Sequence, residues 1–264
     1  MPGMPRANRY VVPGQIYHVT HRCHDRSFLF KFSKDRDAYR AMLRDRLERF
    51  PIQVLGYCLT SNHTHLLLKV DGLAHEVLAR FMQTLEGDFA QYYNLRKRRQ
   101  GAFWSDRYHA VMIDSGEYFW RCLRYIDLNM VRAGVVASPA DWEWCGYQEI
   151  VGLRRRYRIL DREALAEALA PGKGWDDVSK HYAETVRGAL RGQRLQREAC
   201  WTESLAVGGQ AFIERMSSCI PNRMAVERVE VDGLWLVREL SGSYSAFSTP
   251  KRGSKHAKVA QPHV

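Results

Sequence analysis

Apolar positions in the first half of the chain recur with two different periods, and these periods predict alternating strands and helices. Short runs rich in β-branched and aromatic residues predict four strands, at 15–23, 53–60, 64–70 and 108–113. Longer runs with apolar residues three or four apart predict three helices, at 34–50, 73–94 and 115–130. The order β-α-β-β-α-β, followed by a helix, is typical of an α+β, ferredoxin-like fold, in which helices pack on an antiparallel sheet.

The pattern changes after about residue 150. Helix-forming runs follow at 161–170 and 176–192, and from Ser241 the chain is rich in serine, glycine and lysine, a composition typical of disorder. We therefore expect three parts, which are a sheet-containing domain at 1–150, a mainly helical accessory domain at 151–240 that contacts a polyanion, and a disordered basic tail at 241–264.

The charge of the chain narrows the class of partner. It has 40 Lys and Arg residues against 29 Asp and Glu, a formal net charge of +11 that is spread over both halves. Such an excess favours binding to a polyanion, although solubility alone also accounts for it. Neither a long apolar run nor a secretory signal is apparent, and six scattered cysteines without a CxxC pair fit reduced thiols, so we expect a cytoplasmic protein.

The segment SNHTHLLLK, at 61–69, places two histidines one residue apart in a predicted strand. Alternate residues of a strand point to the same side, so His63 and His65 share one face with Leu67 and Lys69. The other face packs on the core and consists of Thr64, Leu66, Leu68 and Val70. Two neighbouring imidazoles can chelate a divalent metal. The spacing alone leaves open that both are half-buried histidines satisfied by their neighbours. The same alternation puts His18 and His21 on opposite faces, which predicts no chelate there.

The predicted helix at 115–130 carries two stripes of different character. An apolar stripe indicates the core-facing side and consists of Phe119, Leu123, Ile126 and Met130. A second stripe, well away from it at about 100° per residue, consists of Tyr118, Arg121, Tyr125 and Asn129. The Asn129 carboxamide, one turn beyond Tyr125, suits a hard cation such as Mg²⁺ or Mn²⁺. The alternative is an interface tyrosine beside an asparagine that bonds the backbone.

Tyr125 becomes chemically useful if its target is activated. A phenol with a pKa of about 10 is a weak nucleophile near neutral pH. A metal bound by two histidines and an amide can polarise a phosphodiester for in-line attack. The reaction would leave a phosphotyrosine and a free 3′-hydroxyl, and it would allow rejoining without a nucleotide cofactor.

Several segments, in this order along the chain, resemble the single-tyrosine HUH transposases, a family that includes the REP-associated tyrosine transposases of bacteria. They are YHVTHRCHDR (17–26), SNHTHLLLK (61–69), FWSDRY (103–108), RYIDLNMVRAGVV (124–136) and WEWCGY (142–147). The resemblance covers about residues 9–150, and 201–216 also resembles the C-terminal region of longer members. It implies His63 and His65 as metal ligands, Tyr125 as nucleophile and Asn129 as the side chain that completes the metal site. Met130 departs from the family, whose members usually have proline there.

The resemblance also implies that the substrate is single-stranded DNA with hairpin or palindromic sites. Binding a single strand needs cations for the phosphates and aromatic rings for the bases. The candidates from this reasoning are Arg22, Arg26, Arg96, Lys97, Arg98, Arg99, Trp104 and Arg107. A core role for Trp104, and a solvated loop at 96–99, are the structural alternatives. Arg154–Arg156 is a further basic run.

The resulting expectation is a metal-dependent bacterial transposase that cleaves and rejoins single-stranded DNA, as a monomer or a homodimer. An alternative from another class is a non-catalytic nucleic-acid-binding regulator derived from a transposase. A second is a zinc hydrolase built on His63 and His65, which would need a carboxylate or a third histidine beside the pair. A covalent DNA adduct that is absent in Tyr125→Phe separates the first reading from both.

Overall fold

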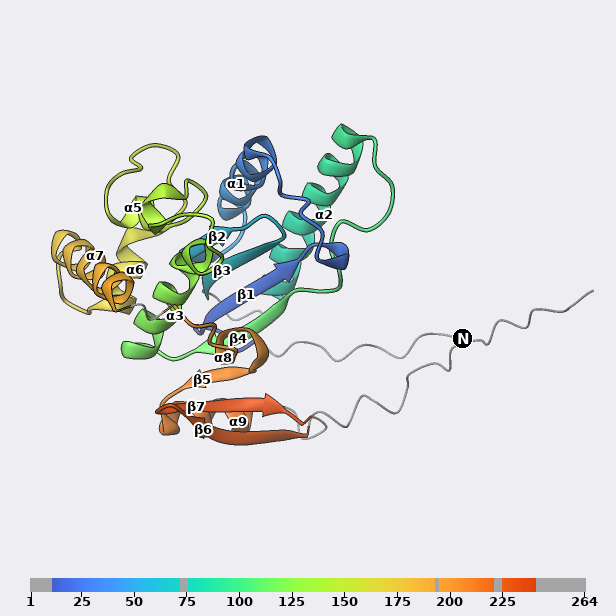
Figure 1. The fold of residues 1–264 in the computed structure, drawn as a ribbon. Helices are drawn as coiled ribbons and strands as arrows, with labels where there is room; N and C mark the ends of the chain where they lie inside the picture. The colour runs from blue at the N-terminus through green and yellow to red at the C-terminus, as the bar shows by residue number, and fades with distance from the viewer. Residues whose placement is uncertain (1–10, 72–75, 193–194, 221–224, 241–264) are drawn as a thin grey trace, which may run out of the picture.

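Strands and helices alternate along the first half of the chain as the hydrophobic pattern predicts. In the computed structural model, which describes residues 11–71, 76–192, 195–220 and 225–240, the elements of this half are β1 (Ile16–Arg22), α1 (Ser33–Leu47), β2 (Ile52–Leu59), β3 (His63–Val70), α2 (Val77–Lys97), β4 (His109–Ile113) and α3 (Glu117–Asp127). The four strands are antiparallel neighbours in the order β2-β3-β1-β4 (Figure 1). This is the ferredoxin-like order, so the predicted fold class is confirmed.

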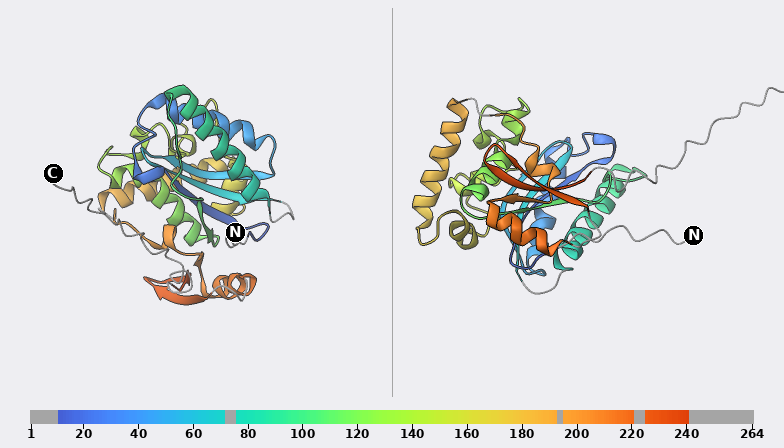
Figure 2. Two further views of the ribbon diagram at one scale, coloured as in Figure 1. Left: turned by 90° about the vertical axis from the view of Figure 1, so that its right-hand side faces the viewer. Right: turned by 90° about the horizontal axis from the view of Figure 1, so that it is seen from below.

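Helices cover both faces of this sheet (Figure 2). α1 and α2 pack together on one face, where the Tyr39 hydroxyl donates to Glu86 at 2.8 Å. Adjacent residues of β3 point to opposite sides, because Thr64 lies near Tyr39 of α1 whereas His65 contacts Asn129 beyond the end of α3. The histidine face of β3 is therefore covered by the helix that carries the candidate tyrosine.

The helix predicted at 115–130 is interrupted once. α3 ends at Asp127, Leu128 leaves the helical conformation with φ −80° and ψ 5°, and a short α4 (Asn129–Arg132) follows. The predicted apolar stripe is buried along both pieces, and it consists of Phe119, Leu123, Ile126 and Met130. Met130 therefore acts as a core residue in α4.

The second half of the chain contains helices where they were predicted and strands where they were not. Its elements are α5 (Tyr147–Ile150), α6 (Arg162–Leu169), α7 (Trp175–Arg191), α8 (Cys200–Glu203), β5 (Ala206–Gly208), α9 (Gln210–Cys219), β6 (Val226–Val231) and β7 (Leu234–Glu239), and two 3₁₀ turns lie earlier, at His24–Arg26 and Pro139–Asp141. β5 pairs in parallel with β4 and antiparallel with β7, so the described sheet has seven strands in the order β2-β3-β1-β4-β5-β7-β6 (Figure 1).

The second half also packs directly on α3. The Trp120 indole of α3 donates to the Leu169 carbonyl of α6 at 2.7 Å, and the Tyr182 hydroxyl of α7 donates to Asp127 at 2.6 Å. Trp201 of α8 is fully buried beside β1 and β4. The division of the chain into domains at residue 150 stays a prediction, and the predicted tail at 241–264 lies outside the described residues.

Candidate active site

His63 and His65 lie at the start of β3, on the face that α3 covers. Their ring centroids are 4.7 Å apart. His65 is buried, with 2% of its surface exposed, whereas His63 keeps part of its surface accessible. The strand thus brings together one imidazole inside the protein and one at its surface.

Burial keeps these imidazoles uncharged. Desolvation lowers the pKa of His63 to about 3, with a smaller contribution from the charge of Arg22. Desolvation also lowers the pKa of His18 to about 3. The pKa of His65 falls well below its ordinary value, because of burial first and the charge that His63 would carry second. Neutral histidine is the form that binds metals.

The hydrogen bonds of His63 determine which ring nitrogen keeps a lone pair. Its Nδ1 lies 2.7 Å from Oδ1 of Asn62, whose amide nitrogen donates to the Arg26 carbonyl at 3.2 Å and so fixes the oxygen toward His63. The Thr60 hydroxyl, 2.9 Å from the same Nδ1, donates to the His63 carbonyl at 2.8 Å. Because both neighbours accept, Nδ1 carries the proton and Nε2 keeps the lone pair that a metal requires.

A longer chain of hydrogen bonds fixes His65 in the same way. Nδ1 of His18, on the neighbouring strand β1, lies 2.7 Å from the Trp201 carbonyl, which can only accept. A neutral His18 therefore turns an unprotonated Nε2 toward Nδ1 of His65, 2.9 Å away. His65 must donate from Nδ1, so its lone pair lies on Nε2 as well.

Asn129 reaches His65 from the break between α3 and α4. Its Nδ2 is 2.9 Å from Nε2 of His65, so the carboxamide occupies the direction of the imidazole lone pair. A half-turn of the amide presents its oxygen in place of its nitrogen. Asn129 can therefore donate to a free His65 or offer an oxygen to an ion.

Tyr125 lies near the end of α3 and faces the histidines. Its ring centroid is 6.2 Å from that of His65 and 6.3 Å from that of His18, in edge-on contacts. Only 5% of its surface is exposed, because Trp201 of α8 lies 6.5 Å away and closes this side of α3. The phenol, the imidazoles and the carboxamide thus come together within one chain.

Arg132 and Trp201 flank the phenol. The Arg132 guanidinium lies 4.0 Å from the centroid of the Tyr125 ring. Burial raises the pKa of Tyr125, while the positive charges of Arg132 and Arg197 act in the opposite direction. Nη2 of Arg132 and Nε1 of Trp201 are buried donors for which the described residues supply no acceptor. Unpaired buried donors of this kind suit an anionic ligand.

The donor set is mixed. The amide oxygen suits Mg²⁺ or Mn²⁺, imidazole nitrogens are more typical of transition metals, and water or phosphate oxygens would complete the coordination. In the described ranges, no group of three or more His, Cys, Asp or Glu side chains could hold a metal. A metal here would therefore depend on His63, His65 and Asn129 together with ligands from solvent or substrate.

Three of the predicted DNA contacts lie around the His63 end of the site. Arg22 ends β1 opposite His63 in the strand register and is exposed. Arg26 is exposed four residues later. The Ser105 amide donates to the Arg22 carbonyl at 2.9 Å, which brings the loop that carries the exposed Arg107 to the same end of the sheet.

The basic run at 96–99 divides into two kinds of residue. Arg96 forms an ion pair with Asp35, a fully buried carboxylate of α1. Arg99 donates to the Asn94 side chain in the last turns of α2 at 3.0 Å and to the Ala102 carbonyl of the turn after it at 2.8 Å. Lys97 and Arg98 are exposed. Arg96 and Arg99 thus bond to other parts of the fold, whereas Lys97 and Arg98 face the solvent.

The aromatic candidates of this region are packed. Phe103 is 2% exposed. Trp104 stacks on His21, with centroids 4.2 Å apart, and donates its indole N–H to the Glu86 carbonyl at 2.9 Å. Phe103 is thus buried, whereas Trp104 keeps part of its surface accessible and has His21 against one face. The other basic run, Arg154–Arg156, follows α5, and its first member donates to a backbone carbonyl at 3.0 Å.

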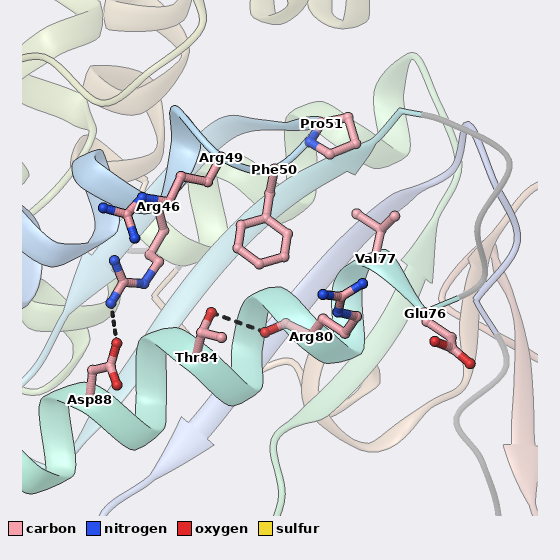
Figure 3. Close-up of a pocket in the computed structure, with 9 residues that line it drawn as sticks. All are labelled: Arg46, Arg49, Phe50, Pro51, Glu76, Val77, Arg80, Thr84 and Asp88. Atoms are coloured by element: carbon pink, nitrogen blue, oxygen red, sulfur yellow. Dashed lines mark hydrogen bonds and ion pairs between the residues drawn. The ribbon is translucent and has the colours of Figure 1, made fainter.

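A cavity of about 800 Å³ opens between α1 and α2, on the face of the sheet opposite the histidines (Figure 3). Its charged lining residues are Arg46, Arg49, Glu76, Arg80 and Asp88, and Arg46 pairs with Asp88. The cavity shares no residue with the Tyr125 region, so it is separate from the candidate active site.

Three residues of this region were not predicted to take part. The alternation of residues relates His18 only to other residues of its own strand, whereas its contact with His65 joins β1 to β3. Arg132 follows Tyr125 by two helical turns, a spacing that does place two side chains on one side, so a signal existed. Trp201 comes from far along the chain, and no local pattern places it.

Within the described ranges, no helix has the length and apolar composition needed to cross a bilayer. Residues 11–129 match the model of a family described as IS200-like transposases. A Haemophilus influenzae protein assigned as a REP-associated tyrosine transposase is 24% identical over 158 residues, or 56% of this chain and 88% of that protein.

Two solved structures have similar chains at 17% identity. One is a REP-associated tyrosine transposase bound to a REP hairpin, with a TM-score of 0.47 over 60% of this chain and 93% of that chain. The other is a Deinococcus radiodurans protein assigned as a transposase, with a TM-score of 0.33 over 50% of this chain and 92% of that chain.

Proposed function

We propose, from the match of residues 11–129 to the model of the IS200-like transposases, that the chain cleaves and rejoins single-stranded DNA through a covalent bond to Tyr125. The observation that carries the proposal is the meeting of Tyr125 with His65, at 6.2 Å between ring centroids, and of Asn129 with His65, at 2.9 Å. A core tyrosine alone would not need a carboxamide and two lone-pair-bearing imidazoles beside it.

In the cleavage step, Oη of Tyr125 bonds to the phosphorus of a phosphodiester and the P–O3′ bond breaks. The phenol gives up its proton, and the leaving O3′ takes up a proton to become a free 3′-hydroxyl. The 5′-phosphate stays on the tyrosine as an ester. Attack on that ester by another 3′-hydroxyl restores the tyrosine and rejoins the strand, so the bond energy is kept throughout.

The residues around Tyr125 have separate tasks in this step. Arg132 stabilises the developing phenolate from the ring face, and its unpaired Nη2 is available to a phosphate oxygen. A divalent ion, Mg²⁺ or Mn²⁺, would be held by His63, His65 and Asn129. Its positive charge would stabilise the negative charge on a non-bridging phosphate oxygen. The closure of Trp201 over Tyr125 limits water at the nucleophile.

We propose hairpin or palindromic sites as the substrate, because the family resemblance implies them and the relative named after REP elements belongs to the same group. The exposed cations Arg22, Arg26 and Arg107 surround the open side of His63 and suit a strand that enters there.

The test is incubation of the protein with a labelled single-stranded hairpin oligonucleotide and Mg²⁺ or Mn²⁺. We expect a DNA–protein adduct that survives denaturing electrophoresis, disappears in Tyr125→Phe and is lost with chelator. Salt-sensitive binding with no adduct under any of these conditions would instead identify a non-catalytic DNA-binding protein. Cleavage that persists in Tyr125→Phe would point to a hydrolase that uses water.

The proposed site is complete within one chain, so the tyrosine acts on the metal site of its own protomer. Mixing Tyr125→Phe with His65→Ala should therefore yield no adduct. Recovery of adduct in the mixture would mean that the tyrosine helix is exchanged between two protomers.

A further inference from the structure

Two phenylalanines between β1 and α1 are exposed to solvent. Phe28 is 68% exposed and Phe32 is 52% exposed. Phe30, between them, is fully buried and stacks on Phe89 of α2 with centroids 5.0 Å apart. The segment is thus anchored by its middle ring, and the outer two rings are left free. Burying a phenylalanine side chain contributes roughly 1.5–3 kcal/mol, so these two positions gain nothing for the fold.

Cations accompany the exposed rings. The Lys97 ammonium lies 4.3 Å from the centroid of the Phe32 ring, and that of Lys31 lies 5.8 Å from it. Arg98, which follows Lys97, is exposed, and Arg26 is exposed two residues before Phe28. Aromatic faces interleaved with cations are what a single-stranded polyanion with stacking bases requires.

The segment is joined to the candidate active site by hydrogen bonds. The Phe30 amide donates to the Ser61 carbonyl at 3.0 Å, and the Asn62 amide nitrogen donates to the Arg26 carbonyl at 3.2 Å. Asn62 is the residue that orients His63. Bases that rest on Phe28 and Phe32 would therefore belong to the stretch of strand next to the phosphate at His63.

We propose that Phe28 and Phe32 are the platform on which unpaired bases of the DNA substrate stack beside the site of cleavage, with Arg26, Lys31, Lys97 and Arg98 contacting the intervening phosphates. The identity of the substrate rests on the proposed function. Trp104, which has His21 stacked on one face, remains a separate candidate for base contact.

The test measures binding without chemistry. The Tyr125→Phe protein, with chelator present, is titrated with a fluorescent single-stranded oligonucleotide and with a matched oligonucleotide that has abasic positions. Adding Phe28→Ala and Phe32→Ala should weaken binding of the normal strand by roughly 5- to 100-fold per ring. The same substitutions should leave binding of the abasic strand nearly unchanged, because that strand has no bases to stack.

Two further variants separate stacking from charge. Lys97→Ala with Arg98→Ala should weaken both strands alike and flatten the salt dependence, by about 0.7 in log–log slope per lost phosphate contact. Tyr157→Ala is the matched control, since Tyr157 is 71% exposed with the Arg44 guanidinium 5.1 Å from its ring, yet lies against the last turn of α1, the opposite end of that helix from Phe32. The control should bind as the parent does.

Equal affinity of the phenylalanine variants and the parent would overturn the proposal, as would an equal loss for normal and abasic strands. A concentration-dependent dimer that the same substitutions dissociate, with no effect on DNA, would assign the surface to self-association. Base-dependent binding without any covalent adduct in the Tyr125-containing protein would leave the platform standing and reject the proposed chemistry, so the two claims fail separately.

Discussion

Replacing His18 with leucine tests whether the hydrogen-bond chain behind His65 controls metal binding. In the protein, the Trp201 carbonyl accepts from His18 at 2.7 Å, and His65 donates to His18 at 2.9 Å. Leucine removes both partners at a fully buried position and adds no new polar group. His65 then has no acceptor for its Nδ1 proton and favours the other tautomer, whose proton on Nε2 blocks a metal.

The expected magnitudes follow from those two lost bonds. A buried polar group left without a partner costs about 1–3 kcal/mol, so the two groups together lower the free energy of unfolding by about 2–6 kcal/mol. Loss of an outer partner of a ligating histidine weakens metal binding by roughly 10- to 100-fold. His18→Gln is the control, because its amide can donate to the Trp201 carbonyl and accept from His65.

Two measurements are needed. The ¹⁵N shifts of the imidazole nitrogens in the metal-free protein should show His65 protonated at Nδ1, and a shift toward Nε2 protonation in His18→Leu. Mn²⁺ titration should then show weaker binding in His18→Leu and near-parental binding in His18→Gln. The reasoning is refuted if folded His18→Leu binds Mn²⁺ as tightly as the parent, or if the parent already carries the His65 proton on Nε2.

Four other substitutions have distinct expected outcomes. Arg132→Gln removes the cation over Tyr125 and with it a charge that lowers the tyrosine pKa. Adduct formation should slow by roughly tenfold or more, and the pH at which it reaches half its maximum rate should rise. An unchanged pH profile would mean that Arg132 does not stabilise the phenolate. Burial raises the pKa of Asp127 to about 7, so the folded state holds this proton more tightly than the unfolded state does. The free energy of unfolding should therefore fall between about pH 4 and 7, by at most about 1.4 kcal/mol per pH unit. Urea denaturation should show a shallower pH dependence of stability in Asp127→Asn, and the same pH dependence in both proteins would contradict the assignment. Arg96→Ala strands a buried carboxylate and should cost about 3 kcal/mol with DNA contacts intact, whereas Lys97→Ala should leave stability within about 0.5 kcal/mol and weaken DNA binding; thermal melts and salt titrations that reverse this pattern would be inconsistent with it.

The alternation of residues in 61–69 was enough to place His63 and His65 on one face, because a strand has a period of two whatever surrounds it. The same is true of the stripes on the tyrosine helix, where Phe119 and Leu123 are buried as predicted. Both patterns depend only on residues that are close together in the chain, so the sequence alone is enough to predict them.

Contacts between segments were not predictable in this way. The pairing of His18 with His65 depends on the register between β1 and β3, in which His18 lies opposite Leu67. The burial of Tyr125 depends on Trp201. A single sequence also does not show which basic side chains form ion pairs inside the fold. For this reason it does not distinguish Arg96, which pairs with Asp35, from the exposed Lys97 as a candidate DNA contact.

The terminal hairpin is a different case, because its signal was present in the sequence. VERVEV at 226–231 contains three valines, which favour a strand, and an Asp-Gly pair separates it from the next strand. Asp232 and Gly233 both have positive φ, 51° and 73°, as the favoured two-residue hairpin turn requires. The prediction of a mainly helical domain at 151–240 did not take this turn signal into account.

The most direct measurement for the central claim is mass spectrometry of the adduct formed with a single-stranded hairpin. Trypsin cleavage after Arg124 and Arg132 would release the peptide YIDLNMVR, which begins with Tyr125. The account predicts a 5′-phosphonucleotide on the tyrosine of this peptide. A nucleotide on any other residue, or none on a protein that still cuts the strand, would contradict it.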